Sequence, residues 1–252
     1  MRRVLVTGAN KGIGRAIVQA ILERADDTFV YLGSRDRARG DEAKDALSSV
    51  NPAFASRISV VEIDVADTAS VERARTNAGI EPLYAIVNNA GVGWGSGLGV
   101  RGLVEVNTFG VQRVCSAFLP LVDAKVGRIV NVTSAAGPSY VAKQPADQQR
   151  FYLDGSISWD RLRAFIDERL TANDVSGEDA YGFSKACTNL YTLILARENP
   201  NPHQRVHPRL HRNRHDAPLR RVPEEDPRRN RHEAPVVRRS CSHAPPLRSS
   251  RR

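Results

Sequence analysis

Thr7-Gly8-Ala9-Asn10-Lys11-Gly12-Ile13-Gly14 joins a short β-branched run, residues 4–7, to a helical pattern over residues 13–24. Three glycines permit a tight turn and a close backbone approach to a pyrophosphate, whose charge suits the positive N-terminal end of a helix. For glycines alone, an ordinary strand-to-helix turn is the alternative. With a strand before and a helix after, the stretch predicts a nucleotide-binding loop, with phosphate held by Gly8, Asn10, Lys11, Gly12, Ile13 and Gly14.

Short β-branched runs alternate with helical patterns from this loop up to residue 199. Strands are expected at residues 4–7, 28–33, 58–63, 83–88 and 128–133. Helices are expected at residues 13–24, 37–50, 69–78, 103–122 and 179–197. This alternation predicts a single α/β domain over residues 1–199, with a Rossmann-type, doubly wound parallel sheet.

A long insertion, residues 137–177, separates the last expected strand from the last expected helix. Its middle carries apolar residues at helical spacing after Ser158, a suitable N-cap. We expect one amphipathic helix there, built on Trp159, Leu162, Phe165, Ile166 and Leu170.

The net charge of +9 belongs to the end of the chain. Residues 1–200 hold 23 basic and 23 acidic residues, whereas residues 201–252 hold 14 arginines and 5 acidic residues. Three cysteines without a CxxC or Cys/His spacing favour a reducing compartment and no metal site. Without an apolar run that could span a bilayer or an apolar signal segment, we expect a cytoplasmic protein that binds no membrane.

Further motifs occur in register with the glycine loop. They are Asp64-Val65, Asn88-Asn89-Ala90-Gly91, Asn107, Ser134 and Tyr181-Gly182-Phe183-Ser184-Lys185. Together with the three residues between the first two glycines, they resemble the short-chain dehydrogenase/reductase family over residues 1–199. The resemblance implies that Asp64 and Val65 hold the adenine and that Asn89, Ala90 and Gly91 line the cofactor cleft. It assigns catalysis to Asn107, Ser134, Tyr181 and Lys185.

These residue types suit the reduction of a carbonyl, which needs a hydride and a proton. A phenol is a weak acid at neutral pH, with an ordinary pKa of roughly 10. Lys185 lies one helical turn after Tyr181, where its ammonium favours release of the phenol proton and can also hold the nicotinamide ribose. Ser134 would polarise the carbonyl, and Asn107 would hold a water that relays protons to Lys185. Each residue alone also fits a structural role, as a surface pair, a turn or a cap.

The end of the second expected strand indicates which nicotinamide cofactor binds. NAD sites place an acidic residue there for the ribose 2′-hydroxyl, whereas NADP sites place a basic one. Here Gly33-Ser34-Arg35 precedes Asp36, and Lys11 adds a second positive charge. Because a guanidinium suits a phosphate, we expect NADPH to bind.

The spacing of 47 residues between Ser134 and Tyr181 resembles the monomeric NADPH-dependent carbonyl reductases of this family. A helical insertion over the Tyr181 helix would block the subunit contact that most members make there, so we expect a monomer that acts on a small-molecule carbonyl. A mobile lid that leaves this face free is the alternative. The segment 92–101 is glycine-rich and shorter than the corresponding segment of relatives. The resemblance therefore does not indicate which substrate binds.

The last segment, residues 200–252, departs from the family in composition. Residues 201–252 hold eight of the fourteen prolines and no glycine, lysine, phenylalanine, tyrosine or tryptophan. Codons chosen for residues 204–218 and read one base later encode NACTPGFIETDMTR, which resembles the family's missing strand end and Pro-Gly turn. We therefore expect a frameshifted, disordered tail and a sheet without its last two strands.

Two alternatives follow from this tail. The first is a catalytically impaired nucleotide-binding protein, because the C-terminal part of the site would be missing. The second is a nucleic-acid-binding arm, which arginine clusters favour. The tail lacks interleaved aromatic or glycine residues, so we expect no nucleic-acid partner.

Overall fold

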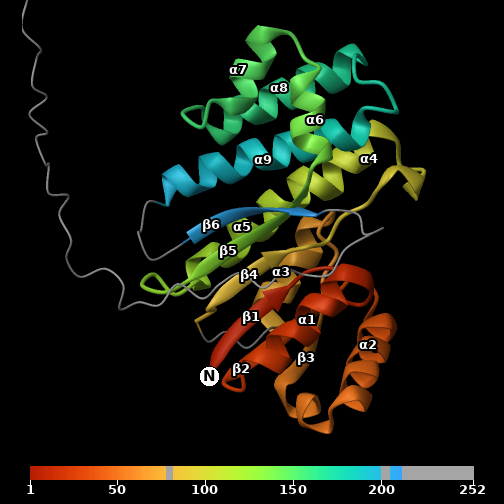
Figure 1. The fold of residues 1–252 in the computed structure, drawn as a ribbon, viewed down its shortest axis with the longest axis vertical. Coiled ribbons are helices and arrows are strands. Elements are labelled where there is room, and N and C mark those ends of the chain that lie inside the picture. The colour runs from red at the N-terminus through yellow and green to blue at the C-terminus, as the bar shows by residue number, and fades with distance from the viewer. Residues whose placement is uncertain (78–81, 200–204, 212–252) are drawn as a thin grey trace, which may run out of the picture. The chain divides into compact units, whose positions relative to one another are not determined.

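The sheet is built from short apolar strands that are covered on both faces. The computed structural model describes residues 1–77, 82–199 and 205–211. Its parallel strands follow the order β3-β2-β1-β4-β5-β6 (Figure 1). Their bounds are β1 Arg2–Val6, β2 Thr28–Ser34, β3 Ile58–Glu62, β4 Ala85–Asn88, β5 Arg128–Ser134 and β6 Arg205–His211. The Rossmann-type fold is thereby confirmed, and its topological switch point lies between β1 and β4.

Alternating side chains of the strands supply a core beneath each layer of helices. Val4 and Val6 point to one face and Leu5 to the other, as the two-residue period of a strand requires. The first face is covered by α1 Gly12–Arg24 and α2 Arg37–Val50, and the second by α3 Thr68–Asn77 and α5 Gly110–Phe118. Burial on both faces explains the continuous apolar runs of these strands.

The helical region before β5 is longer and less regular than the single helix expected over residues 103–122. It begins with α4 Gly99–Val104, passes through the π-helical segment η3 Glu105–Phe109, and continues as α5 and the 3₁₀ turn η4 Leu119–Leu121. A π-helical turn inserts an extra residue into the spiral and is frequent at functional sites. Two further 3₁₀ segments are η1 Pro52–Arg57 and η2 Trp94–Ser96.

The insertion contains three helices, so the expectation of one helix is wrong. The expected helix is α8 Trp159–Ala172, and Ser158 caps it by accepting from the Arg161 backbone N–H at 3.1 Å. The additional helices α6 Ala136–Ala142 and α7 Ala146–Leu153 have seven and eight residues, too short to show a helical period. Their aromatic residues pack on α9 Ala180–Glu198, against which Figure 1 shows all three helices grouped.

The prediction that the sheet ends at its fifth strand is wrong. β6 pairs in parallel with β5, from Arg128 opposite Arg205 to Ser134 opposite His211 (Figure 1). The sequence of β6 alternates apolar and polar residues, which is a strand pattern. Its Pro208 is tolerated because β6 lies at the edge of the sheet that the described residues form. The predicted disorder of the tail and the missing seventh strand concern residues 200–204 and 212–252, which lie outside the described residues.

Within the part of the chain that the structure describes, no helix is long and apolar enough to cross a lipid bilayer.

Candidate active site

The glycine loop has the backbone geometry that its sequence predicts. Gly8 and Gly12 adopt φ angles of 62° and 54°, in the left-handed region that favours glycine. A Cβ at Gly8 would lie 2.7 Å from the Ala90 Cα, so the loop packs tightly on the segment after β4. A Cβ at Gly12 would meet nothing within 4 Å, so this glycine borders open space at the start of α1.

That open space adjoins the N-terminus of α1, where the chain can hold an anion. Lys11 is the N-cap, but its side chain makes no capping hydrogen bond, and the first turn of α1 has no acidic residue. The N–H groups of a first helical turn have no acceptor within the helix. The loop residues therefore fit a pyrophosphate, which would accept from these N–H groups at the positive end of the helix dipole.

The segment after β4 is fixed to the glycine loop by side-chain hydrogen bonds. The Asn89 Nδ2 donates to the backbone oxygens of Thr7 and Gly8 at 3.0 and 3.1 Å. The Thr7 Oγ1 accepts from the backbone N–H groups of Asn89 and Ala90, both at 3.1 Å. These bonds hold the two walls of the predicted cleft together, beside the switch point of the sheet.

Asp64 and Val65 follow β3, where the adenine is expected. The Asp64 Oδ1 accepts from the Ala66 N–H at 2.9 Å. The Val65 carbonyl accepts from Arg113 Nη1 at 2.5 Å, and the Arg113 guanidinium also pairs with Glu105 at 2.6 Å. Arg113 was not predicted from the sequence, because its partners Val65 and Glu105 come from separate segments.

At the end of β2 the acidic side chain is already occupied. The Asp36 Oδ1 caps α2 by accepting from the Arg39 N–H at 3.0 Å, and its other oxygen lies 3.8 Å from the Arg39 Nε. The Arg35 side chain is exposed and makes no ion pair with any described residue. The charged group that remains available at this strand end is therefore a cation.

Tyr181 and Lys185 lie one turn apart on α9. The Lys185 Nζ is 5.8 Å from the centre of the Tyr181 ring and donates to the Val132 backbone oxygen at 3.1 Å. Lys185 is only 6% exposed. Because burial disfavours the ammonium, the pKa of Lys185 falls to about 8, close enough to neutrality for proton exchange.

Asn107 lies in the π-helical turn and is fully buried. Its Oδ1 accepts from the Val92 N–H at 2.9 Å, and its Nδ2 donates to the Val92 oxygen and the Ser184 Oγ, both at 3.0 Å. A Cβ at Gly91 would lie 3.1 Å from the Asn107 Oδ1 and 3.6 Å from the Lys185 Nζ. The structure thus brings Asn107 and Lys185 to one space beside Gly91.

Ser134 is the last residue of β5, two residues after the carbonyl that binds Lys185. Its Oγ accepts from the Ala136 N–H at 3.2 Å. Within the described residues, this hydroxyl makes no hydrogen bond to Tyr181. The structure therefore places Ser134 at the correct end of the sheet without joining it to the Tyr181–Lys185 pair.

Trp94 is a neighbour of Tyr181 that was not predicted from the sequence. Its ring centre lies 4.6 Å from that of Tyr181, and its Nε1 donates to the Glu178 carbonyl at 3.1 Å. The available signal was a lone large aromatic residue within the glycine-rich stretch 92–101. The sequence marks that stretch as atypical of the family. Which residue Trp94 contacts depends on the tertiary fold and has no local signal.

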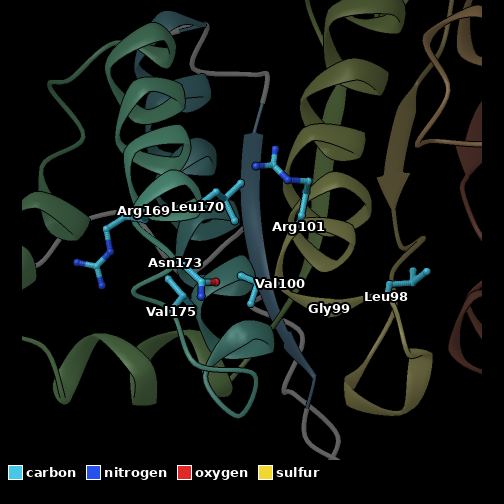
Figure 2. Close-up of a pocket in the computed structure, with 8 residues that line it drawn as sticks. All are labelled: Leu98, Gly99, Val100, Arg101, Arg169, Leu170, Asn173 and Val175. Atoms are coloured by element: carbon cyan, nitrogen blue, oxygen red, sulfur yellow. The ribbon is translucent and has the colours of Figure 1, made fainter.

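A pocket of about 260 Å³ lies between the same glycine-rich stretch and the insertion. Figure 2 shows its lining side chains, which come from the start of α4 and from the end of α8 with the residues that follow. They are Leu98, Gly99, Val100, Arg101, Arg169, Leu170, Asn173 and Val175. None of these was predicted as a site residue from the sequence.

Comparisons with known proteins agree with this geometry. A family model described as short chain dehydrogenase matches residues 2–146. Carbonyl reductase [NADPH] 3 of Mus musculus is 31% identical over 216 residues, which cover 78% of this chain and 74% of that protein. (+)-Neomenthol dehydrogenase of Arabidopsis thaliana is 29% identical over 237 residues, covering 79% of each chain.

A solved structure shows the same relationship in three dimensions. Menthone neomenthol reductase from Mentha piperita superimposes with a TM-score of 0.69 and 26% sequence identity. The match covers 82% of this chain and 88% of that one.

Proposed function

The chain belongs to the short-chain dehydrogenase family, and on that premise we propose that it reduces a ketone, aldehyde or quinone to an alcohol with NADPH. The observation that carries the proposal is the grouping of Asn107 and Lys185 beside Gly91, with the Tyr181 ring 5.8 Å from the Lys185 Nζ. The similarity to an NADPH-named carbonyl reductase and the cationic end of β2 support the cofactor assignment.

The cofactor would lie with its pyrophosphate on the glycine loop and would supply the hydride. Arg35 and Lys11 would bind its 2′-phosphate, since Asp36 is occupied as the α2 cap. Asp64 and Val65 would border the adenine, and Asn89, Ala90 and Gly91 would form the cleft wall.

In the proposed reaction the Tyr181 hydroxyl donates its proton to the carbonyl oxygen. The Lys185 ammonium stabilises the phenolate that remains, and its pKa of about 8 allows it to return a proton at neutral pH. Asn107 holds the proton path between Lys185 and solvent. Ser134 donates a hydrogen bond to the developing oxyanion, once its hydroxyl turns from Ala136 toward substrate.

A second candidate is a nucleotide-binding protein with impaired catalysis. The observation that favours it is the break in composition after residue 200, where the family's substrate-binding segment is expected. We propose that residues 200–252 are read out of frame, so that this chain binds NADPH weakly and turns over slowly. The two candidates share the cofactor cleft and differ in turnover.

Oxidation of NADPH in the presence of isatin or a quinone tests the proposed reaction. We expect the parent chain to oxidise NADPH slowly and the Tyr181→Phe variant to lose this activity while retaining its NADPH affinity. Lys185→Ala should lower both the activity and the NADPH affinity, because the same ammonium would interact with Tyr181 and with the nicotinamide ribose. Normal turnover by Tyr181→Phe would refute the mechanism, whereas NADPH binding by the parent without any turnover would favour the second candidate.

A further inference from the structure

Trp94 lies next to Tyr181, the proposed proton donor. Packing into the core does not explain this position, because Trp94 is largely exposed. Its ring centre lies 4.6 Å from the Tyr181 ring, with the two planes inclined by 54°. Nevertheless, 59% of the residue is exposed, unlike the other large aromatic residues, which are half-buried or buried. Exposure of so large an apolar surface beside a reactive hydroxyl suits contact with a ligand.

The Trp94 ring is held at its edge, so its orientation is defined. The Nε1 donates to the Glu178 carbonyl at 3.1 Å, three residues before Tyr181. The glycines on either side border open space, because a Cβ at Gly93 or Gly95 would meet nothing within 4 Å. One side of the ring therefore covers Tyr181, while a large part of the remaining surface is open to solvent.

Further apolar residues occur in the two chain segments that the hydrogen bond between Trp94 and Glu178 joins. Leu98 follows Trp94 by four residues and is exposed, and Val175 precedes Glu178 by three. Both residues also line the pocket between α4 and α8 (Figure 2). Trp94 thus places a flat aromatic ring next to Tyr181, and the pocket bordered by the same two chain segments is lined partly by aliphatic side chains.

We propose that Trp94 is a specificity-determining residue, against which the flat ring of an unsaturated carbonyl substrate stacks while its oxygen reaches Tyr181. This inference rests on the proposed function. A conjugated ring next to the carbonyl gains an aromatic contact that a saturated ring of similar size cannot make. The chain should therefore prefer flat carbonyl compounds to puckered ones.

The test compares isatin, which is flat, with cyclohexanone, which is puckered, on the full chain with NADPH. Dissociation constants are measured by ligand-observed saturation-transfer NMR, and KM values by NADPH oxidation. Trp94→Leu should raise both constants for isatin about tenfold and change those for cyclohexanone less than threefold. Trp94→Phe, which keeps a flat ring, should change the isatin constants less than threefold.

Trp159→Phe is the matched control, because this second tryptophan packs against Phe109 and Tyr191 instead of Tyr181. It should leave both ligands unaffected. Unchanged isatin affinity in Trp94→Leu, or an equal loss for isatin and cyclohexanone, would overturn the proposal. A parent chain that does not oxidise NADPH would contradict the proposed function. The NMR measurement would still test the role of Trp94 in that case, because it measures binding and needs no turnover.

Discussion

Lys185 illustrates how burial suits a residue to the proposed proton exchange at a cost in stability. Its ammonium is nearly inaccessible to water and has one described acceptor, the Val132 carbonyl. Desolvation lowers its pKa from an ordinary value near 10.5 to about 8. The same burial that makes the proton exchangeable penalises the charged form in the folded state.

Lys185→Met should therefore stabilise the fold at neutral pH. The free-energy cost of burying the ammonium is fully present below pH 8, because Lys185 is then protonated in both the folded and the unfolded chain. It disappears as the pH rises from 8 toward 10.5, where both states are neutral. We expect a gain on the order of 3 kcal/mol at pH 7, from about 1.4 kcal/mol per pKa unit, and a much smaller gain at pH 10.

Urea unfolding of the parent and Lys185→Met at both pH values measures this difference. Taking the difference between two proteins cancels the titration of other groups. A variant that is less stable than the parent at pH 7, or a gain that does not change with pH, would contradict the role of burial.

Arg35 should set the preference for NADPH over NADH. Losing a charge-assisted contact to phosphate costs about 1.5–3 kcal/mol, so Arg35→Asp should weaken NADPH binding roughly 10- to 150-fold. NADH has no 2′-phosphate and should be much less affected. Arg37→Gln is the control, because Arg37 is paired with Asp41 at 3.1 Å. Calorimetric titration of both cofactors measures the effect, and a retained NADPH preference in Arg35→Asp would show that another residue binds the phosphate.

Among the elements, those that depend on local pattern were predictable and those that depend on tertiary contacts were not. The glycine loop, α2 and the Ser158 cap follow from residue types at fixed spacing. By contrast, α6 and α7 are short and gain their stability from the aromatic cluster on α9. The strand β6 was missed because Pro208 and the change in composition outweighed its alternating pattern.

The same distinction applies to the candidate site. Tyr181 and Lys185 share one helix, so their proximity follows from the helical repeat. The distance between Asn107 and Lys185 depends on how the π-helical turn packs on α9, and the Trp94 contact depends on the path of a glycine-rich loop. Such contacts between distant segments have no local signature.

The three insertion helices bear on the oligomeric state. They pack on α9, which has 13 of its 19 residues buried, so the helix that carries Tyr181 has little surface left for a subunit contact. We expect the protein to sediment as a monomer at micromolar concentration in analytical ultracentrifugation. A dimer that persists at these concentrations would show that the insertion leaves another face free.

At the scale of the whole molecule, the cofactor half of the fold and the last 53 residues have different origins in our account. The first follows the family from the glycine loop to α9, whereas residues 200–252 have a different composition, which we attribute to a shifted reading frame. Sequencing the transcript across the codons for residues 198–209 would test the shift. Reads that confirm the present frame would remove the reason to expect weak turnover.

The central measurement is the transfer of deuterium to isatin from NADPH that carries deuterium at both hydrogen positions of the nicotinamide C4. We expect mass spectrometry to find the label on the carbinol carbon of the product, with the full chain transferring it and Tyr181→Phe failing to do so. Deuterium in the product of both proteins would contradict the role of Tyr181. An unlabelled product, or none from a chain that binds NADPH, would contradict the assignment of this protein as a carbonyl reductase.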